Sequence, residues 1–168
     1  MHPIHDAAVR MALTPAALSA LAPTSSARAA VSNLLEHQLA DDALKLQAHL
    51  LQPGYAVAWV CGRARRHILD ASDQQGLALA EAWLRDPLDT HRQQALDFAV
   101  SHRCATIGAW LAATAAWSAE DATRVQAAHA VVATLTRLAA IAPEGFVPAR
   151  DACIRDALGL LDTVAPSP

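Results

Sequence analysis

The segment Val125–Ala139 constrains the fold of this chain more than any other stretch. Its apolar residues recur at alternating intervals of three and four, at Val125, Ala128, Val132, Leu135 and Ala139. This spacing is that of one face of an α-helix, whereas a half-buried strand would alternate at every second residue. Alanine is the commonest residue, and aromatic residues make up only 4% of the chain, a composition that favours helices over strands. The sequence therefore predicts an all-α protein.

Start and stop signals divide the rest of the chain into short and medium helices. Capping residues or capping-box spacings occur at Thr14 before Pro15, at Ser26, at Ser72 with Gln75, and at Ser118 with Asp121. Stop signals occur at Asp86-Pro87 and at Pro143 with Gly145, and the last helix is expected from about Ala149. These signals predict about eight helices in a single domain over residues 1–168, arranged as a multi-helix bundle or a helical-hairpin array. Residues 1–25 are expected to form a peripheral N-terminal segment, and residues 163–168 a frayed tail.

The charge of the chain argues against a nucleic-acid partner. The formal net charge is -3 and the isoelectric point is near 6.2, so no overall positive field would attract a polyanion. The three cysteines, Cys61, Cys104 and Cys153, are odd in number and far apart, which fits neither a disulfide framework nor paired metal ligands. They are typical of a reducing cytoplasm, which is the compartment we expect.

No segment of the sequence predicts a membrane span. The apolar run Cys104–Trp117 is too short to cross a bilayer, and Val125–Ala142 carries His129 and Arg137. The N-terminal MHPIHDAAVRMALTP has an acidic residue and two histidines where an export signal needs a cationic start and a long apolar core. We therefore expect a soluble protein that contacts no membrane.

The stretch YAVAWVCGRARRH, residues 55–67, places an apolar run directly before three arginines. On a helix, Tyr55, Trp59 and Gly62 would share one face, and the small Gly62 would let a partner helix approach closely. The arginines would follow in the last turns, where cations complement the carboxyl end of the helix dipole. Three interpretations of these arginines are open: a solvated helix end, a contact to an acidic protein surface, or a nucleic-acid contact.

The protein-contact interpretation makes Arg63, Arg65 and Arg66 the candidate binding residues, as an accessible cationic rim. Three tryptophans, Trp59, Trp83 and Trp110, lie in apolar helical contexts and are expected to be buried where helices join. Cys61 has apolar neighbours and is expected to be a buried, unreactive thiol.

No pattern in the sequence predicts a catalytic, cofactor or metal site. Among the eight histidines, His37 lies four residues from the acidic Asp41, but that pair spans an expected helix break, and no second close pair of ligands completes a site. Ser101, His102 and Cys104 are close in sequence, but no strand-turn-helix elbow surrounds them. No glycine-rich phosphate loop occurs. We therefore predict no catalytic residue, no metal and no cofactor.

Several segments resemble a family of uncharacterised bacterial domains. They are YAVAWVCGRAR, ALAEAWLRDPLDTHRQQALDFA and TIGAWLAATAAWS, with DALKLQAHLLQPGYAVAW upstream. Members of that family have an AVWWAC-like helix, then a helix that ends at Asp-Pro or Glu-Pro, and a later tryptophan-rich helix. The resemblance covers roughly residues 30–120. This chain departs from the family pattern at Ala58, where members carry a tryptophan, and at residues 52–55.

The resemblance implies a function in protein–protein interaction. Similar proteins are met near type VI secretion genes, so the implied function is that of a non-catalytic adaptor, chaperone or accessory protein of that apparatus. The implied partner is another protein, such as a secretion tip, a PAAR-like protein or an effector. Two alternatives remain: an immunity or regulatory protein that binds a toxin, and an enzyme of an unrecognised kind. The sequence does not predict the oligomeric state.

Overall fold

The computed structural model describes residues 3–21 and 26–162, and it is built from α-helices. In this part of the chain the helices are α1 Pro3–Arg10, α2 Pro15–Ala20, α3 Ala27–Glu36, α4 Ala40–Leu50, α5 Pro53–Ala64, α6 Ala71–Arg85, α7 Asp89–Ser101, α8 Ile107–Ser118, α9 Arg124–Ala140 and α10 Phe146–Asp156. Two short 3-10 helices, η1 Asp121–Thr123 and η2 Leu158–Asp162, follow α8 and α10. The all-α prediction is confirmed, with no strand among the described residues. The tail 163–168 lies outside them.

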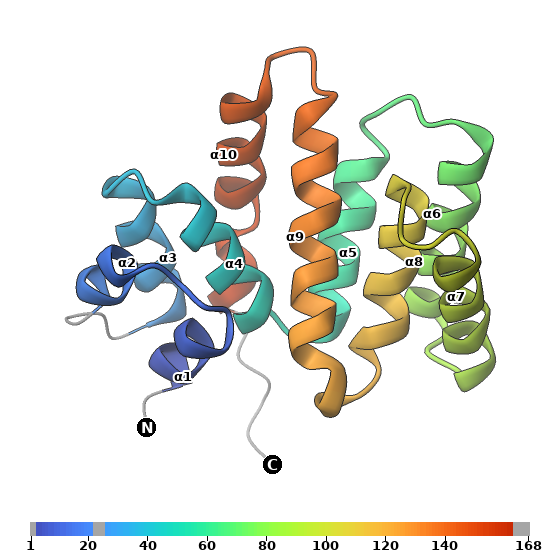
Figure 1. Cartoon of the computed structure of the whole chain (residues 1–168), viewed down its shortest axis with the longest axis horizontal. Coiled ribbons are helices and arrows are strands. Elements are labelled where there is room, and N and C mark those ends of the chain that lie inside the picture. Colours follow the sequence, from blue (N-terminus) through green and yellow to red (C-terminus); the bar gives the residue numbers. More distant parts are fainter. Residues whose placement is uncertain (1–2, 22–25, 163–168) are drawn as a thin grey trace.

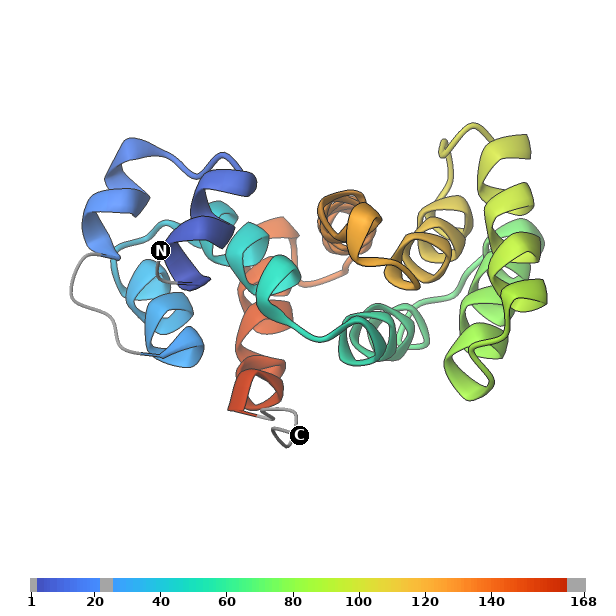
Figure 2. The same cartoon turned by 90° about the horizontal axis from the view of Figure 1, so that it is seen from below.

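The helices form an elongated array with α9 near its centre (Figure 1). Helix α9 packs against α4, α5, α8 and α10, while α6 and α7 lie at one edge and α1, α2 and α3 at the other. Seen from below, α8 and α9 lie side by side and α5 packs against both (Figure 2). The connections α5–α6 and α9–α10 lie at the upper end of Figure 1, and α4–α5 and α8–α9 lie at the lower end.

Local signals place several of the helix ends. The hydroxyls of Thr14 and Ser26 accept hydrogen bonds from the backbone of Ala17 and Ala29, as N-caps do. The start signal at Ser72 is misplaced, because α6 begins at Ala71 and Asp70 is its cap. The signal at Ser118 is wrong, since that residue is the last of α8. Two further differences are that α1 was not expected from the sequence and that α10 begins at Phe146, three residues before the expected start.

Helices α6 and α8 approach each other closely where two glycines meet. A Cβ atom on Gly76 would lie 2.1 Å from the carbonyl oxygen of Gly108, and one on Gly108 would lie 2.6 Å from Cα of Asp73. The Asp73 carboxylate also accepts a 2.6 Å hydrogen bond from the Gly108 backbone N–H. The close approach expected at Gly62 is not found, because Gly62 is exposed and nothing lies within 4 Å of its Cβ position.

Two buried side chains pair with the last turn of α10. The last carbonyl groups of a helix have no partner within the helix. Here the Trp59 indole donates to the carbonyl of Cys153 at 3.1 Å, and the Gln47 amide donates to that of Ile154 at 3.2 Å. Trp59 and Trp83 are each only 6% exposed, whereas Trp110 is partly buried.

Candidate functional site

The three arginines at the carboxyl end of α5 do not form a free cationic rim. Arg63 is buried, and its Nη1 donates to Asp156 at 2.9 Å. Nη1 of Arg66 lies 3.4 Å from the same carboxylate oxygen, and Nε of Arg65 donates to Glu81 at 2.6 Å. The prediction of an accessible rim is therefore wrong for Arg63, whose charge holds α10 against α5. Arg65 and Arg66 remain exposed, although each contacts an acidic side chain of this chain.

The cysteines and histidines that the structure describes form no metal-binding group. Cys61 is buried, and burial raises the pKa of its thiol to about 12, with the charge of Glu81 acting in the same direction. Among the described residues, no three His, Cys, Asp or Glu side chains gather as metal ligands would. Ser101 and His102 do share a 3.1 Å hydrogen bond, but His102 also lies 2.9 Å from the Phe98 carbonyl, at the exposed end of α7.

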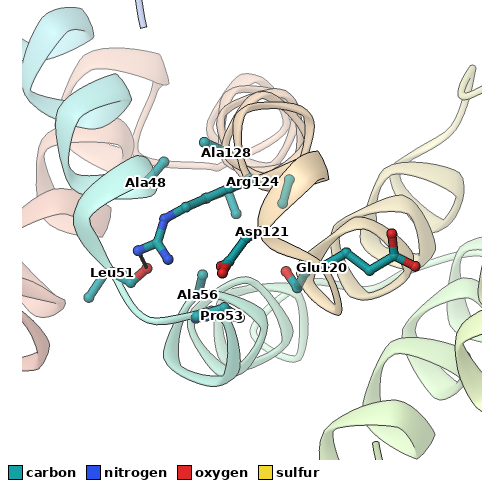
Figure 3. Close-up of a pocket in the computed structure, with 11 residues that line it drawn as sticks. Ala48, Leu51, Pro53, Ala56, Glu120, Asp121, Arg124 and Ala128 are labelled. Atoms are coloured by element: carbon teal, nitrogen blue, oxygen red, sulfur yellow. Dashed lines mark hydrogen bonds between the residues drawn. The ribbon is translucent and has the colours of Figure 1, made fainter. Parts of the chain in front are cut away.

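At the lower end of the array, the α8–α9 connection borders two hollows. The first, here called the small pocket, lies between the α4–α5 connection and α9 (Figure 3). Its walls are mostly apolar, including Ala48, Leu51 and Ala56. The second, here called the His49 cleft, lies between α1, the end of α4 and the start of α9, and its polar lining residues are Asp6, Arg10, His49, Asp121 and Arg124. The volumes are about 20 Å³ and about 450 Å³, so only the cleft has room for more than a water molecule or two.

Arg124 lies between these hollows and is fixed by the backbone. Its Nε and Nη2 donate to the carbonyl of His49, and Nη2 also donates to that of Leu51, all at 3.3 Å. These are carbonyls at the carboxyl end of α4, where a cation is favoured. In Figure 3 the guanidinium of Arg124 extends toward Leu51, whereas the Asp121 carboxylate points toward Ala56 and Pro53.

His49 occupies the last turns of α4 and is only 7% exposed. Its Nδ1 is buried without a hydrogen-bond partner. Burial lowers the pKa of its imidazole, and the nearby charges of Arg124, Arg10 and His129 lower it further, while Asp6 opposes them. His49 is therefore held neutral at pH 7 in a surrounding that is positive on balance.

Sequence reasoning missed both His49 and Arg124. One signal could have pointed to Arg124: a cation in the first turn of a helix opposes the helix dipole, so another contact must stabilise it there. No comparable signal exists for His49, because its burial depends on α1, which packs against α4.

Comparison with known proteins identifies a family. Residues 30–161 match the family of unknown function DUF6931. The chain belongs to this family. The DUF6931 match covers most of α3, all of α4 to α10 and most of η2, and it leaves out α1 and α2. No curated protein and no solved structure matches the chain. None of the helices within residues 3–21 and 26–162 is long and apolar enough to cross a membrane.

Proposed function

We propose that this protein is a non-catalytic protein-interaction module, and that it binds its partner through the upper end of the array. The observation that carries the proposal is a group of exposed apolar side chains on two neighbouring connections. Ile68 in the α5–α6 connection is fully exposed, and Ile141 and Val147 at the α9–α10 connection are 53% and 54% exposed. Together with Phe146 they are here called the upper patch.

Electrostatic effects support the proximity of these two connections. Burial and Arg63 lower the pKa of His67, in the connection after α5, while the charge of Glu144, in the connection after α9, raises it. Both connections lie at the upper end of the array (Figure 1). Single exposed apolar residues are common on any protein, but grouped ones on adjacent connections are typical of binding surfaces. Arg65 and Arg66 lie on the same α5–α6 connection as Ile68.

The chemistry of the upper patch suits a partner surface that is apolar at its centre and acidic at its rim. Exposed rim charges act chiefly on the association rate and on its salt dependence. Together with the resemblance to sequences met near type VI secretion genes, this supports an adaptor, chaperone or accessory function, with a tip, PAAR-like or effector protein as partner. The alternative is an immunity or regulatory protein, whose partner would be a single toxin.

The test is affinity purification from the native host, followed by binding measurements on the partner that mass spectrometry identifies. The double variant Ile68→Ser with Val147→Ser should weaken binding about tenfold or more, because truncating apolar anchors at the centre of an interface is costly. The matched control is Val100→Ser, which changes a side chain of α7 that is 65% exposed, at the edge of the array. Equal binding by the double variant and the control would refute this surface. Capture of one toxin, with neutralisation of its activity, would favour the alternative.

A further inference from the structure

The His49 cleft brings together nitrogen atoms from three helices. Arg10 comes from the end of α1, His49 from the last turns of α4, and Arg124 from the first turn of α9. The Asp6 carboxylate binds only Nε of Arg10, at 2.8 Å. The carbonyls of His49 and Leu51 bind only Nε and Nη2 of Arg124.

Several of these donors remain free. Nη1 and Nη2 of Arg10 and Nη1 of Arg124 have no hydrogen bond to any residue that the structure describes. Nδ1 of His49 is also without a partner, but it is fully enclosed, so the donors that are open to a ligand are those of the two arginines. The cleft therefore offers hydrogen-bond donors that the chain itself does not use.

The charges around the cleft favour a negative ligand beside His49. The groups that face the imidazole are Arg10 and Asp6 from α1 and Arg124 and His129 from α9. Arg124 and Arg10 each act on the imidazole more strongly than Asp6 does, so the cationic groups prevail there. Asp121 also lines the cleft, but its carboxylate points toward Ala56 and Pro53, on the side of the small pocket (Figure 3).

We propose that the His49 cleft binds a small oxyanion, a carboxylate or phosphate group, between the guanidinium groups of Arg10 and Arg124 and beside the His49 imidazole. Arginine suits this task because its fork of N–H donors matches the geometry of carboxylate and phosphate oxygens. The apolar part of such a ligand would lie against Ala7, Leu50 and Val125. A bound anion favours the protonated imidazole, so binding takes up a proton and strengthens as the pH falls.

The test is a titration of the full chain with small anions. The NMR resonances of the His49 imidazole report binding. The probes are inorganic phosphate, capped glutamate as a stand-in for an acidic side chain, and sulfate, whose charge does not change between about pH 5.5 and pH 7.5. We expect saturable shifts in the millimolar range or below, with tighter sulfate binding at the lower pH. Saturation by phosphate alone would identify a free oxyanion as the ligand. Saturation by capped glutamate would identify an acidic side chain as the ligand. Either result supports the site.

Two variants decide whether the cleft is responsible. Arg10→Gln should weaken binding about tenfold, since it removes a charge-assisted pair of donors at an exposed position that the fold tolerates. The matched control is Arg137→Gln, which changes an exposed arginine of α9 that does not line the cleft and should leave binding unchanged. Absence of a saturable shift with any probe, or equal weakening by the two variants, would overturn the proposal.

Discussion

The indole of Trp59 on α5 donates a 3.1 Å hydrogen bond to the backbone carbonyl of Cys153 on α10, a residue 94 positions further along the chain. Both residues are buried, so water cannot replace either partner of this bond. The sequence predicts that Trp59 is buried, and the last turn of α10 has carbonyl groups that need a hydrogen-bond donor. The contact joins the two.

Removal of the Trp59 donor should lower the free energy of unfolding more than removal of the Trp83 indole, which makes no hydrogen bond. Trp59→Phe should lower the free energy of unfolding by about 1 to 3 kcal/mol, because the Cys153 carbonyl is left buried and unpaired. Trp83 is equally buried, but its Nε1 has no hydrogen-bond partner, so Trp83→Phe should cost less than about 1.5 kcal/mol. Urea denaturation of both variants measures the difference. Equal losses would mean that the Trp59 hydrogen bond contributes nothing to stability.

Alanine substitutions at glycine should change stability with opposite sign in two helices. Gly108→Ala should destabilise the protein by about 1 to 3 kcal/mol or more, because the new Cβ would overlap the backbone of α6. Gly62→Ala should stabilise it by about 0.5 to 1 kcal/mol, because alanine costs less backbone entropy in an unobstructed helix interior. The melting temperatures of the two variants test this. A stable Gly108→Ala protein would show that α6 and α8 can separate without loss of packing.

The three thiols should differ in their reaction with iodoacetamide. Burial raises the pKa of Cys61 to about 12, so its thiol is protonated at pH 8 and is also out of reach. Burial raises the pKa of Cys153 and Cys104 as well, but Cys104 is only partly buried. We expect slow labelling of Cys104 alone in the native protein and of all three thiols in denaturant, as measured by mass spectrometry. Rapid native labelling of Cys61 would contradict its position in the core.

His49 should make the protein less stable as the pH falls. Its pKa is lowered in the folded state by burial and by Arg124 and Arg10, so below about pH 6.5 the unfolded chain binds a proton that the folded chain does not. Stability is therefore highest above that pH and declines as the pH drops toward the lowered pKa. The variant His49→Gln should reduce the slope of unfolding free energy against pH between about pH 7.5 and pH 5.5. An unchanged slope would mean that His49 titrates alike in both states. These measurements belong in a buffer without carboxylate or phosphate, because a bound anion would oppose the effect.

The parts of the fold that the sequence predicts are those set by local chemistry. Thr14 and Ser26 cap their helices because a hydroxyl meets a backbone N–H three residues later, and that contact needs no other part of the chain. Ser118 is not a helix start, because it is the last residue of α8 in spite of its capping-box spacing with Asp121. The length of α8 depends on its packing against α6, α7 and α9, which the local sequence does not show.

The candidate sites depend on contacts between distant parts of the chain, and the sequence predicts them poorly. Arg63 and Asp156 are 93 residues apart, so nothing in the local sequence shows that α10 supplies a counter-charge. The choice of Gly62 for a close helix approach was wrong for the same reason. A glycine marks a possible approach, but only the arrangement of helices decides that Gly76 and Gly108 meet while Gly62 faces solvent.

The bonds from Gln47 and Trp59 to the end of α10 have a consequence for synthesis of the protein. They span 107 and 94 residues, so both donors emerge from the ribosome long before their acceptors exist. Until α10 docks, α4 and α5 carry two polar groups whose native partners are missing, within surfaces that are otherwise apolar. Completion of the core is therefore expected to wait until α10 has left the ribosome. A chain truncated before Phe146 should remain partly unpacked and dependent on chaperones.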